Sequence, residues 1–340
     1  MECSFSRIFR FIKLTGLVVL SLLIVSLLSL VLWKQNDDKK LLGLYADKGQ
    51  FVSFGDESLL KQVDPVTGWG SIILTDWEGN ALPCRVTYPP GPVPERGYGC
   101  VIVNYGVGQR MTFFERLAPL FANRGVIMIM PEQYGRGDRR AKGEQNFFEK
   151  VYEPRERAAR LVAETRMLVD YLCAQPEVDQ DRIDYMGISY GGIVGTTLLA
   201  EEPRFRSGTF VMAGGNISMM LNGLLRHVYP DSKVLVPIVA KFGAWWMSAF
   251  EPLDHLGAVK MEKLLFLWVE PDELIPLSAR QQLVATASVP VTEKTYPGPH
   301  SRPPVESVQQ MIFDSLDWMG YALEEDNAER KDFGKPTASF

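Results

Sequence analysis

The chain has 340 residues, of which 46% are hydrophobic and 23% charged, and its formal net charge is −5. This composition is typical of a globular protein, and the length suits one large α/β domain with an appendage. The sequence shows no basic tract and no aromatic-basic pattern, which argues against nucleic-acid binding.

The first predicted element is an apolar helix near the N-terminus. Residues Leu14 to Trp33 include no charged side chain. About 20 helical residues span the ~30 Å hydrocarbon core of a bilayer. A cleaved signal peptide is the alternative, but its apolar region is usually about 7–15 residues long and precedes a small-residue cleavage site, which Val31-Leu32-Trp33 does not provide. We therefore expect a tail at 1–13 and an uncleaved transmembrane anchor at 14–33.

The orientation of this anchor follows from the segments on either side. Three basic residues precede it and four follow it before residue 49, so charge asymmetry is small. A short basic tail resists translocation, whereas a long domain crosses largely regardless of charge. We expect the N-terminus in the cytoplasm and the large domain on the periplasmic or extracellular side.

A polar connector at 34–68 precedes the main domain, which we place at 69–324. Eight segments have the apolar, β-branched character of strands, namely 71–76, 81–88, 100–105, 126–130, 183–188, 209–213, 264–269 and 291–296. Helices are expected at 112–123, from Pro154 onward, at 193–200 and at 304–323. This alternation predicts an α/β fold with a mostly parallel eight-stranded sheet and helices on both faces. Residues 325–340 form a polar C-terminal tail.

Residues 217–263 interrupt the alternation, because they separate two strands without containing one. They are rich in Met, Leu and Trp, and include Trp245 and Trp246. An insertion of this length is often a lid. The alternative is that these residues only close the core over the sheet. We expect a cap over the active site, with Trp245 and Trp246 contacting the substrate.

The cysteines indicate neither a disulfide framework nor a zinc site. Cys84, Cys100 and Cys173 lie in the domain at irregular spacing. Buried free thiols are the simplest interpretation. A bridge between Cys84 and Cys100 stays open at this stage.

The chemistry centres on Gly187-Ile188-Ser189-Tyr190-Gly191, which ends a predicted strand and begins a helix. In that context a G-x-S-x-G sequence places the serine on a sharp turn with its hydroxyl exposed. A serine becomes a strong nucleophile only when a base takes its proton and a third group orients the base. Ser189 is therefore the predicted nucleophile.

In α/β hydrolases the acid and then the histidine follow the nucleophilic serine along the chain. Asp272 follows a clear apolar strand, with Glu270 and Glu273 as its rivals. His300 is the only histidine after that strand, whereas His227 and His255 belong to the insertion. We assign Asp272 as the acid and His300 as the base.

Two backbone amides are predicted to stabilise the developing oxyanion. One belongs to Tyr190, the residue after the nucleophile. The other is the amide of Val107, in the loop Tyr105-Gly106-Val107-Gly108. No G-K-[ST] sequence follows this loop, so it is not a phosphate-binding loop. We expect the Tyr105 side chain to contact the substrate.

Together these residues resemble the α/β-hydrolase superfamily over roughly residues 70–324. Pro131–Asp138 resembles the Asp-x-x-Gly-x-Gly loop that follows the fourth strand in this superfamily. Val178–Ile183 and Glu251–Asp254 are similar to its dienelactone hydrolase, acetyl xylan esterase and prolyl-oligopeptidase-like branches. The sequence departs from the family pattern where Tyr105 and Val269 replace a common histidine and glycine. The resemblance implies a serine hydrolase that works through an acyl-enzyme and needs no metal or organic cofactor.

The leading hypothesis is a membrane-anchored hydrolase of carboxylic esters, acting on a small-molecule or lipid-like acyl substrate. Alternatives are a peptidase of the prolyl-oligopeptidase-like type, an acyltransferase or thioesterase, and a tethered binding protein that has kept the fold. The sequence names neither the substrate nor the oligomeric state, because fold does not determine function.

Overall fold

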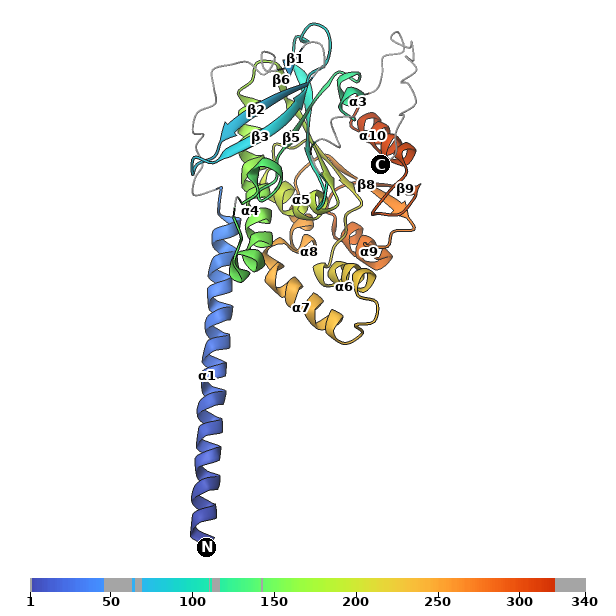
Figure 1. The fold of residues 1–340 in the computed structure, drawn as a ribbon. Coiled ribbons are helices and arrows are strands. Elements are labelled where there is room, and N and C mark those ends of the chain that lie inside the picture. Colours follow the sequence, from blue (N-terminus) through green and yellow to red (C-terminus); the bar gives the residue numbers. More distant parts are fainter. Residues whose placement is uncertain are drawn as a thin grey trace.

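The computed structural model describes residues 2–45, 63–64, 69–109, 111, 117–141 and 143–321. The predicted C-terminal tail, most of the predicted connector and the first part of the predicted helix at 112–123 lie outside these residues. Figure 1 shows a domain built around one sheet, with a long helix projecting from it.

The sheet confirms the predicted fold class. Its strand order is β1-β2-β3-β5-β4-β6-β7-β8-β9, and the neighbours from β5 to β9 are parallel while β1, β2 and β3 pair antiparallel. The eight predicted strands are all present, and the short β1 is additional. Their bounds are β1 Val63–Asp64, β2 Trp69–Thr75, β3 Ala81–Thr87, β4 Tyr98–Asn104, β5 Val126–Pro131, β6 Val178–Ile188, β7 Ser207–Val211, β8 Lys263–Glu270 and β9 Val291–Pro297.

Helices cover both faces of the sheet, as predicted. The α-helices are α1 Glu2–Leu42, α3 Ala118–Ala122, α4 Phe147–Cys173, α5 Tyr190–Glu201, α6 Ile217–Val228, α7 Leu235–Trp246, α8 Pro252–His255, α9 Leu277–Thr286 and α10 Val305–Trp318, and the short 3-10 turns are η2 Gly137–Arg139, η3 Ser248–Phe250 and η4 Leu256–Ala258. α4 and α5 cover one face, and α3 and α10 the other. β4 supplies both cores, because its successive side chains point to opposite faces. Cys100 and Ile102 join the core beneath α4, and Val101 and Val103 the core beneath α10.

The start of α4 corrects the prediction from Pro154. The helix begins at Phe147, and Pro154 lies inside it. Asn146 accepts a hydrogen bond from the amide of Glu149 at 2.9 Å, and the Glu149 carboxylate accepts one from the amide of Asn146 at 2.8 Å. This capping box begins the helix upstream of the proline.

α1 is a continuous helix that includes the predicted anchor and extends beyond it. Among the described residues, it is the one helix long and apolar enough to cross a membrane. Its large apolar side chains from Leu14 to Leu30 are exposed, whereas Leu41 is buried in the core of the domain. The last turns of α1 are therefore part of the domain rather than of a free connector.

Charged residues join α1 to α4. The Arg155 side chain is fully buried, and its guanidinium donates to Asp37 and to Asp38 at 2.7 Å each and to the carbonyl of Trp246. Lys34, also buried, donates to Asp38 at 2.6 Å and to Ser248 at 2.5 Å. Because a buried charge is costly unless it is paired, this cluster holds α1 in one position on the domain.

The three cysteines in the domain are free thiols. Cys84 and Cys100 are buried on β3 and β4, so the bridge that the sequence left open is not formed. Burial raises the pKa of the Cys84 thiol well above its ordinary value, which keeps it protonated.

Replacing Arg155 by alanine tests the junction between α1 and α4. Arg155→Ala leaves Asp37 and Asp38 without their shared cation, and loss of one partner of a buried ion pair costs about 3–5 kcal/mol. We expect a loss of this size in the free energy of unfolding of the full chain in detergent micelles. Arg204→Ala is the control, because Arg204 is 38% exposed and its ion pairs with Asp170 and Glu202 should contribute at most about 1 kcal/mol. Equal, small losses of unfolding free energy in both variants would contradict the role of Arg155 in joining α1 to α4.

Candidate active site

Ser189 lies at the junction of β6 and α5, with backbone angles φ 49° and ψ −111°. A positive φ is unusual for a residue with a side chain, and such strain persists only where neighbours enforce it. Here the Ser189 amide donates to the carbonyl of Val211 at 2.7 Å, and the Ser189 carbonyl accepts from Ile193 in the first turn of α5 at 2.9 Å. These two hydrogen bonds hold the sharp turn at Ser189 between β6 and α5.

The glycines around Ser189 are needed for close approach. A Cβ on Gly191 would lie 2.1 Å from the carbonyl oxygen of Asn104 on β4. A Cβ on Gly187 would lie 2.7 Å from the Cα of Gly192. Both distances are too short for any side chain, so these positions require glycine if α5 is to begin this close to the sheet.

Three predicted residues form one hydrogen-bonded row. Ser189 Oγ lies 3.0 Å from His300 Nε2. His300 Nδ1 lies 3.1 Å from Asp272 Oδ2 and 3.2 Å from Oδ1. Asp272 follows β8 and His300 follows β9, so the carboxyl ends of neighbouring parallel strands bring together residues far apart in the chain. This is the geometry in which an imidazole can accept a hydroxyl proton.

The surroundings of Asp272 fix the position of its carboxyl group. Its side chain is fully buried, and Oδ1 accepts hydrogen bonds from the amides of Leu274 at 3.0 Å and Ile275 at 2.8 Å. The guanidinium of Arg280 lies 3.4 Å from Oδ2. These contacts hold both carboxylate oxygens toward the imidazole of His300.

Glu273, considered only as a rival acid, holds the histidine loop instead. Its carboxylate accepts hydrogen bonds from the amides of His300 at 2.7 Å and Ser301 at 2.8 Å. Partial burial opposes ionisation, but the hydrogen bonds from Ser301 and from neighbouring backbone amides outweigh it and lower the pKa of Glu273 to about 2. The sequence shows three acids close together in Glu270-Pro271-Asp272-Glu273. Which of them contacts the His300 ring and which binds its backbone depends on how the loop folds.

The other candidate acid and bases lie elsewhere. Glu270 is exposed at the end of β8. His255 Nε2 lies 2.8 Å from the carbonyl of Ala249, and His227 is exposed in the last turn of α6. None of these three side chains has a hydrogen bond to Ser189 among the described contacts.

The loop carrying Val107 lies beside the serine. A Cβ on Gly106 would lie 3.1 Å from Ser189 Cβ, so the Gly106 backbone lies close to the Ser189 side chain. The Gly106 amide donates to the side chain of Gln109 at 2.9 Å, which closes the loop. Val107 itself is 56% exposed. Its amide and that of Tyr190 therefore belong to the two segments that adjoin Ser189.

Tyr105 does not have the predicted orientation toward a substrate. Its side chain is fully buried, with the hydroxyl donating to Glu132 and accepting from the Gln133 amide at 3.1 Å. The Gln133 side chain donates in turn to the Tyr105 carbonyl at 2.5 Å. Tyr105 thus ties the loop at 105–108 to the loop after β5, and its side chain has no free surface for a substrate.

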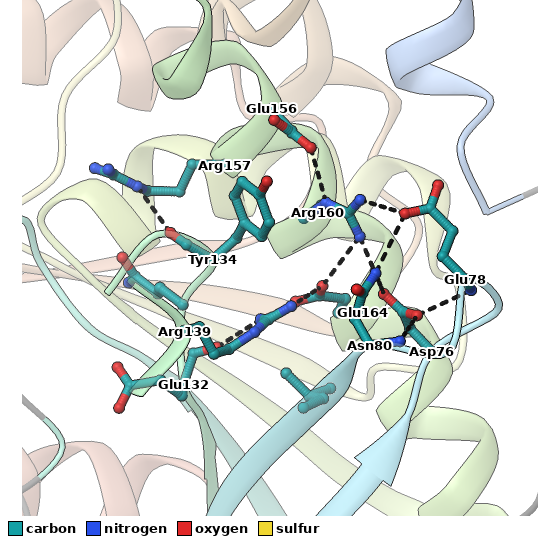
Figure 2. Close-up of polar contacts among 12 residues, drawn as sticks. Asp76, Glu78, Asn80, Glu132, Tyr134, Arg139, Glu156, Arg157, Arg160 and Glu164 are labelled. Carbon is teal, nitrogen blue, oxygen red and sulfur yellow. Dashed lines mark hydrogen bonds and ion pairs between the residues drawn. The ribbon is translucent and has the colours of Figure 1, made fainter. Parts of the chain in front are cut away.

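A buried ionic cluster holds that second loop on α4 (Figure 2). Arg139 donates to Glu164 at 2.6 and 2.7 Å and to the carbonyl of Glu132 at 2.9 Å. Arg160 continues the cluster to Asp76, at 3.0 Å, beyond β2. The cluster supports the Glu132–Tyr105 contact and so, indirectly, the loop beside Ser189.

Trp245 and Trp246 contact α1 instead of lining the site. The Trp246 ring stacks on Trp33 with centroids 5.9 Å apart, and its indole N–H donates to the carbonyl of Val151 at 2.9 Å. The Trp245 ring lies 5.5 Å from Nζ of Lys34. The sequence suggested a substrate contact for both tryptophans. Their packing against a distant N-terminal helix leaves no local pattern that could have corrected this.

In the described residues, no cluster of three or more His, Cys, Asp or Glu side chains could hold a metal ion.

Comparison with solved structures agrees with the fold. An acetyl xylan esterase from Paenibacillus sp. R4 is similar at 15% identity and TM-score 0.56, covering 84% of this chain and 93% of its own. A Klebsiella pneumoniae protein assigned as a dienelactone hydrolase is similar at 17% identity and TM-score 0.55, covering 74% and 98%. Dipeptidyl peptidase 4 from Porphyromonas gingivalis, at 16% identity and TM-score 0.55, is matched over 75% of this chain and only 35% of its own.

A comparison with curated protein sequences gives no match. Residues 83–245 match the model of the dienelactone hydrolase family, a segment that includes the Val107 loop and the Ser189 turn. Residues 83–245 are therefore a segment of dienelactone hydrolase type within an α/β-hydrolase-like fold.

Proposed function

We propose that this chain is a membrane-anchored serine hydrolase that cleaves carboxylic esters through an acyl-enzyme on Ser189. The observation that carries the proposal is the row from Ser189 through His300 to Asp272, with contacts of 3.0 and 3.1 Å on a strained strand-to-helix turn. A purely structural serine would need neither the buried carboxylate nor the imidazole.

In the first half of the reaction, Ser189 Oγ attacks the ester carbonyl while His300 Nε2 takes its proton. The imidazolium that forms keeps its Nδ1–H on Asp272, whose negative charge stabilises it. The carbonyl oxygen becomes an oxyanion, and in this proposal the amides of Val107 and Tyr190 bind it. His300 then returns the proton to the departing alcohol, and the acyl group stays on Ser189.

In the second half, a water molecule takes the place of the alcohol. His300 Nε2 accepts its proton as the water oxygen attacks the acyl-enzyme, and then protonates Ser189 Oγ as the bond to the acyl group breaks. Acid and alcohol are the products.

The anchor is the second part of the proposal. α1 is long and apolar enough to cross a membrane, and its side chains from residue 13 to residue 30 are exposed. The basic residues before the span favour an N-terminus in the cytoplasm and a catalytic domain on the other side. A small-molecule or lipid-like ester is the substrate that suits this location.

Replacing Ser189 tests the nucleophile. We expect a fluorophosphonate probe to label the full chain and to fail completely with Ser189→Ala, because the probe needs an activated serine. Ser278→Ala, at an exposed serine on α9, should label like the wild type. Rates on p-nitrophenyl esters, aminoacyl amides and acyl thioesters should be highest for the esters. Equal labelling of wild type and Ser189→Ala would contradict the proposal, and preference for amides would indicate a peptidase.

The Val107 amide can be removed without a large change of side chain. Val107→Pro deletes the donor, and loss of one oxyanion-hole donor lowers kcat by about 10²–10³-fold. Val107→Ala keeps the amide, and because the valine is exposed we expect nearly wild-type kcat. Steady-state kinetics on a p-nitrophenyl ester measure both. Similar kcat values for the two variants would exclude this amide from the oxyanion site.

Glu273→Gln tests the support of the histidine loop. The amide side chain keeps one acceptor but loses the charge, so we expect kcat to fall by about tenfold, less than the 10² that a misplacement of about 1 Å can cost. Glu270→Gln, at the exposed neighbouring acid, should have little effect.

The effect of Glu273→Gln on thermal stability should depend on pH. The pKa of Glu273 is about 2 in the folded chain, below its ordinary value of 4.5, so the ionised carboxylate stabilises the fold. This contribution is fully present above pH 4.5 and is lost as the pH falls toward 2. The difference in Tm between wild type and Glu273→Gln should therefore be largest above pH 4.5 and shrink on acidification. A difference independent of pH would contradict the role of the charge.

A further inference from the structure

The outer surface of α7 is apolar and exposed. Leu235, Ile238, Val239 and Phe242 are 61%, 60%, 44% and 53% exposed. Their spacing is that of one helical face, which normally turns inward. In α7 the buried positions are Val236 and Ala240. A monomer rarely leaves so regular an apolar stripe in water.

The stripe continues onto the end of α6 and the connection between the two helices. Leu224, Val228, Tyr229 and Val234 are 41%, 54%, 58% and 77% exposed. The two helices pack against each other, so these side chains extend the same surface. We call this set of residues, together with the α7 stripe, the α6–α7 face.

A second exposed apolar group lies at the start of α4. Phe147 and Phe148 are 72% and 79% exposed. α1 and α4 run in parallel, because Trp33 on α1 contacts Tyr152, while Tyr45, in the turn just after α1, contacts Asp170 further along α4. The beginning of α4, one turn before Tyr152, therefore lies toward the apolar part of α1.

The α6–α7 face is continuous with α1. Phe242 stacks on Trp246 with centroids 6.4 Å apart, and Trp246 stacks on Trp33, the last residue of the apolar span. Figure 1 shows α6, α7 and the start of α4 at the end of the domain from which α1 projects. Tryptophan is enriched where a span meets the lipid headgroups, which is the position this stack would occupy.

The charges around the face suit a lipid surface. Between residues 217 and 246 the charged side chains are Arg226, Lys233, Lys241 and the single acid Asp231, and all four are exposed. Basic side chains near a bilayer are attracted to anionic headgroups. A helix with an apolar face and a basic edge is the type that lies in the interface.

We propose that the α6–α7 face, with Phe147 and Phe148, inserts into the headgroup region of the bilayer that α1 crosses. This inference rests on the membrane anchoring in the proposed function. The inner side of α6 packs through Met220 against Ile275, next to the Asp272 loop, and Ile193, one turn after Ser189, packs on the same cluster. The segment that touches lipid thus also adjoins the catalytic row, and the substrate class that follows is an ester dissolved in the bilayer.

The test measures depth in the membrane and is independent of catalysis. The full chain, with Cys3 and Cys173 replaced by serine, is reconstituted into vesicles of phosphatidylcholine and phosphatidylglycerol. A fluorophore is attached to a new cysteine at one position per variant: Ile238→Cys on the face, Ile73→Cys on β2 as a similarly exposed aliphatic control, and Leu22→Cys within the span. Val239→Cys is a second position on the face. Spin-labelled lipids quench a fluorophore that lies in the bilayer, and iodide quenches one in water.

We expect lipid quenching at positions 238 and 239 at least threefold stronger than at position 73, and strong quenching at position 22. Quenching at 22 but not at 238 or 239 overturns the docking of the face and leaves the anchor intact. Absence of quenching at 22 overturns the anchor and this inference with it. Protection of 238 from iodide without lipid quenching, together with crosslinked dimers, shows that a second copy covers the face and also overturns it. Labelling of Ser189 by a fluorophosphonate in the same vesicles reports separately on the hydrolase.

Discussion

The backbone at Ser189 is the constraint on which the site depends. Its φ of 49° turns the chain sharply from β6 into α5 and leaves the hydroxyl at the carboxyl edge of the sheet. The turn is possible because Gly191 can approach the carbonyl of Asn104, where any side chain would collide. The strain is local, but it is maintained by the parallel pairing of β4, β6 and β7 around it. The position of the nucleophile is thus a property of the sheet.

The second half of the site is built from two loops that hold each other. Asp272 orients the imidazole of His300, and Glu273 binds the backbone of the same histidine. Neighbouring carboxylates therefore have different tasks, because one is buried against Arg280 and the other lies nearer the surface. On the opposite side of Ser189, Tyr105 and Glu132 join the loop of Val107 to the ionic cluster on α4. The same α4 holds α1 through Arg155, so the proposed anchor and the ionic cluster behind the site are both attached to one helix.

Much of this arrangement could be predicted from local patterns. Eight strands were visible as apolar runs, and the order of Ser189, Asp272 and His300 indicated three residues that the structure places in hydrogen-bond contact. The start of α4 was misplaced because a proline suited to a first turn was given more weight than the capping pair Asn146 and Glu149. Trp245 and Trp246 were misassigned because their partners lie on α1, some two hundred residues away, and no local pattern encodes that contact. The role of Glu273 depends on loop geometry in the same way.

The most direct measurement of the central claim is the mass of the peptide containing Ser189 during turnover. The full chain is mixed with a p-nitrophenyl ester, quenched in acid within the first turnovers, digested and analysed by mass spectrometry. The account predicts that this peptide gains the mass of the acyl group, localised on Ser189, and loses it as substrate is exhausted. Release of p-nitrophenol with Ser189 unmodified at every time point, or with the acyl group on another residue, would contradict it.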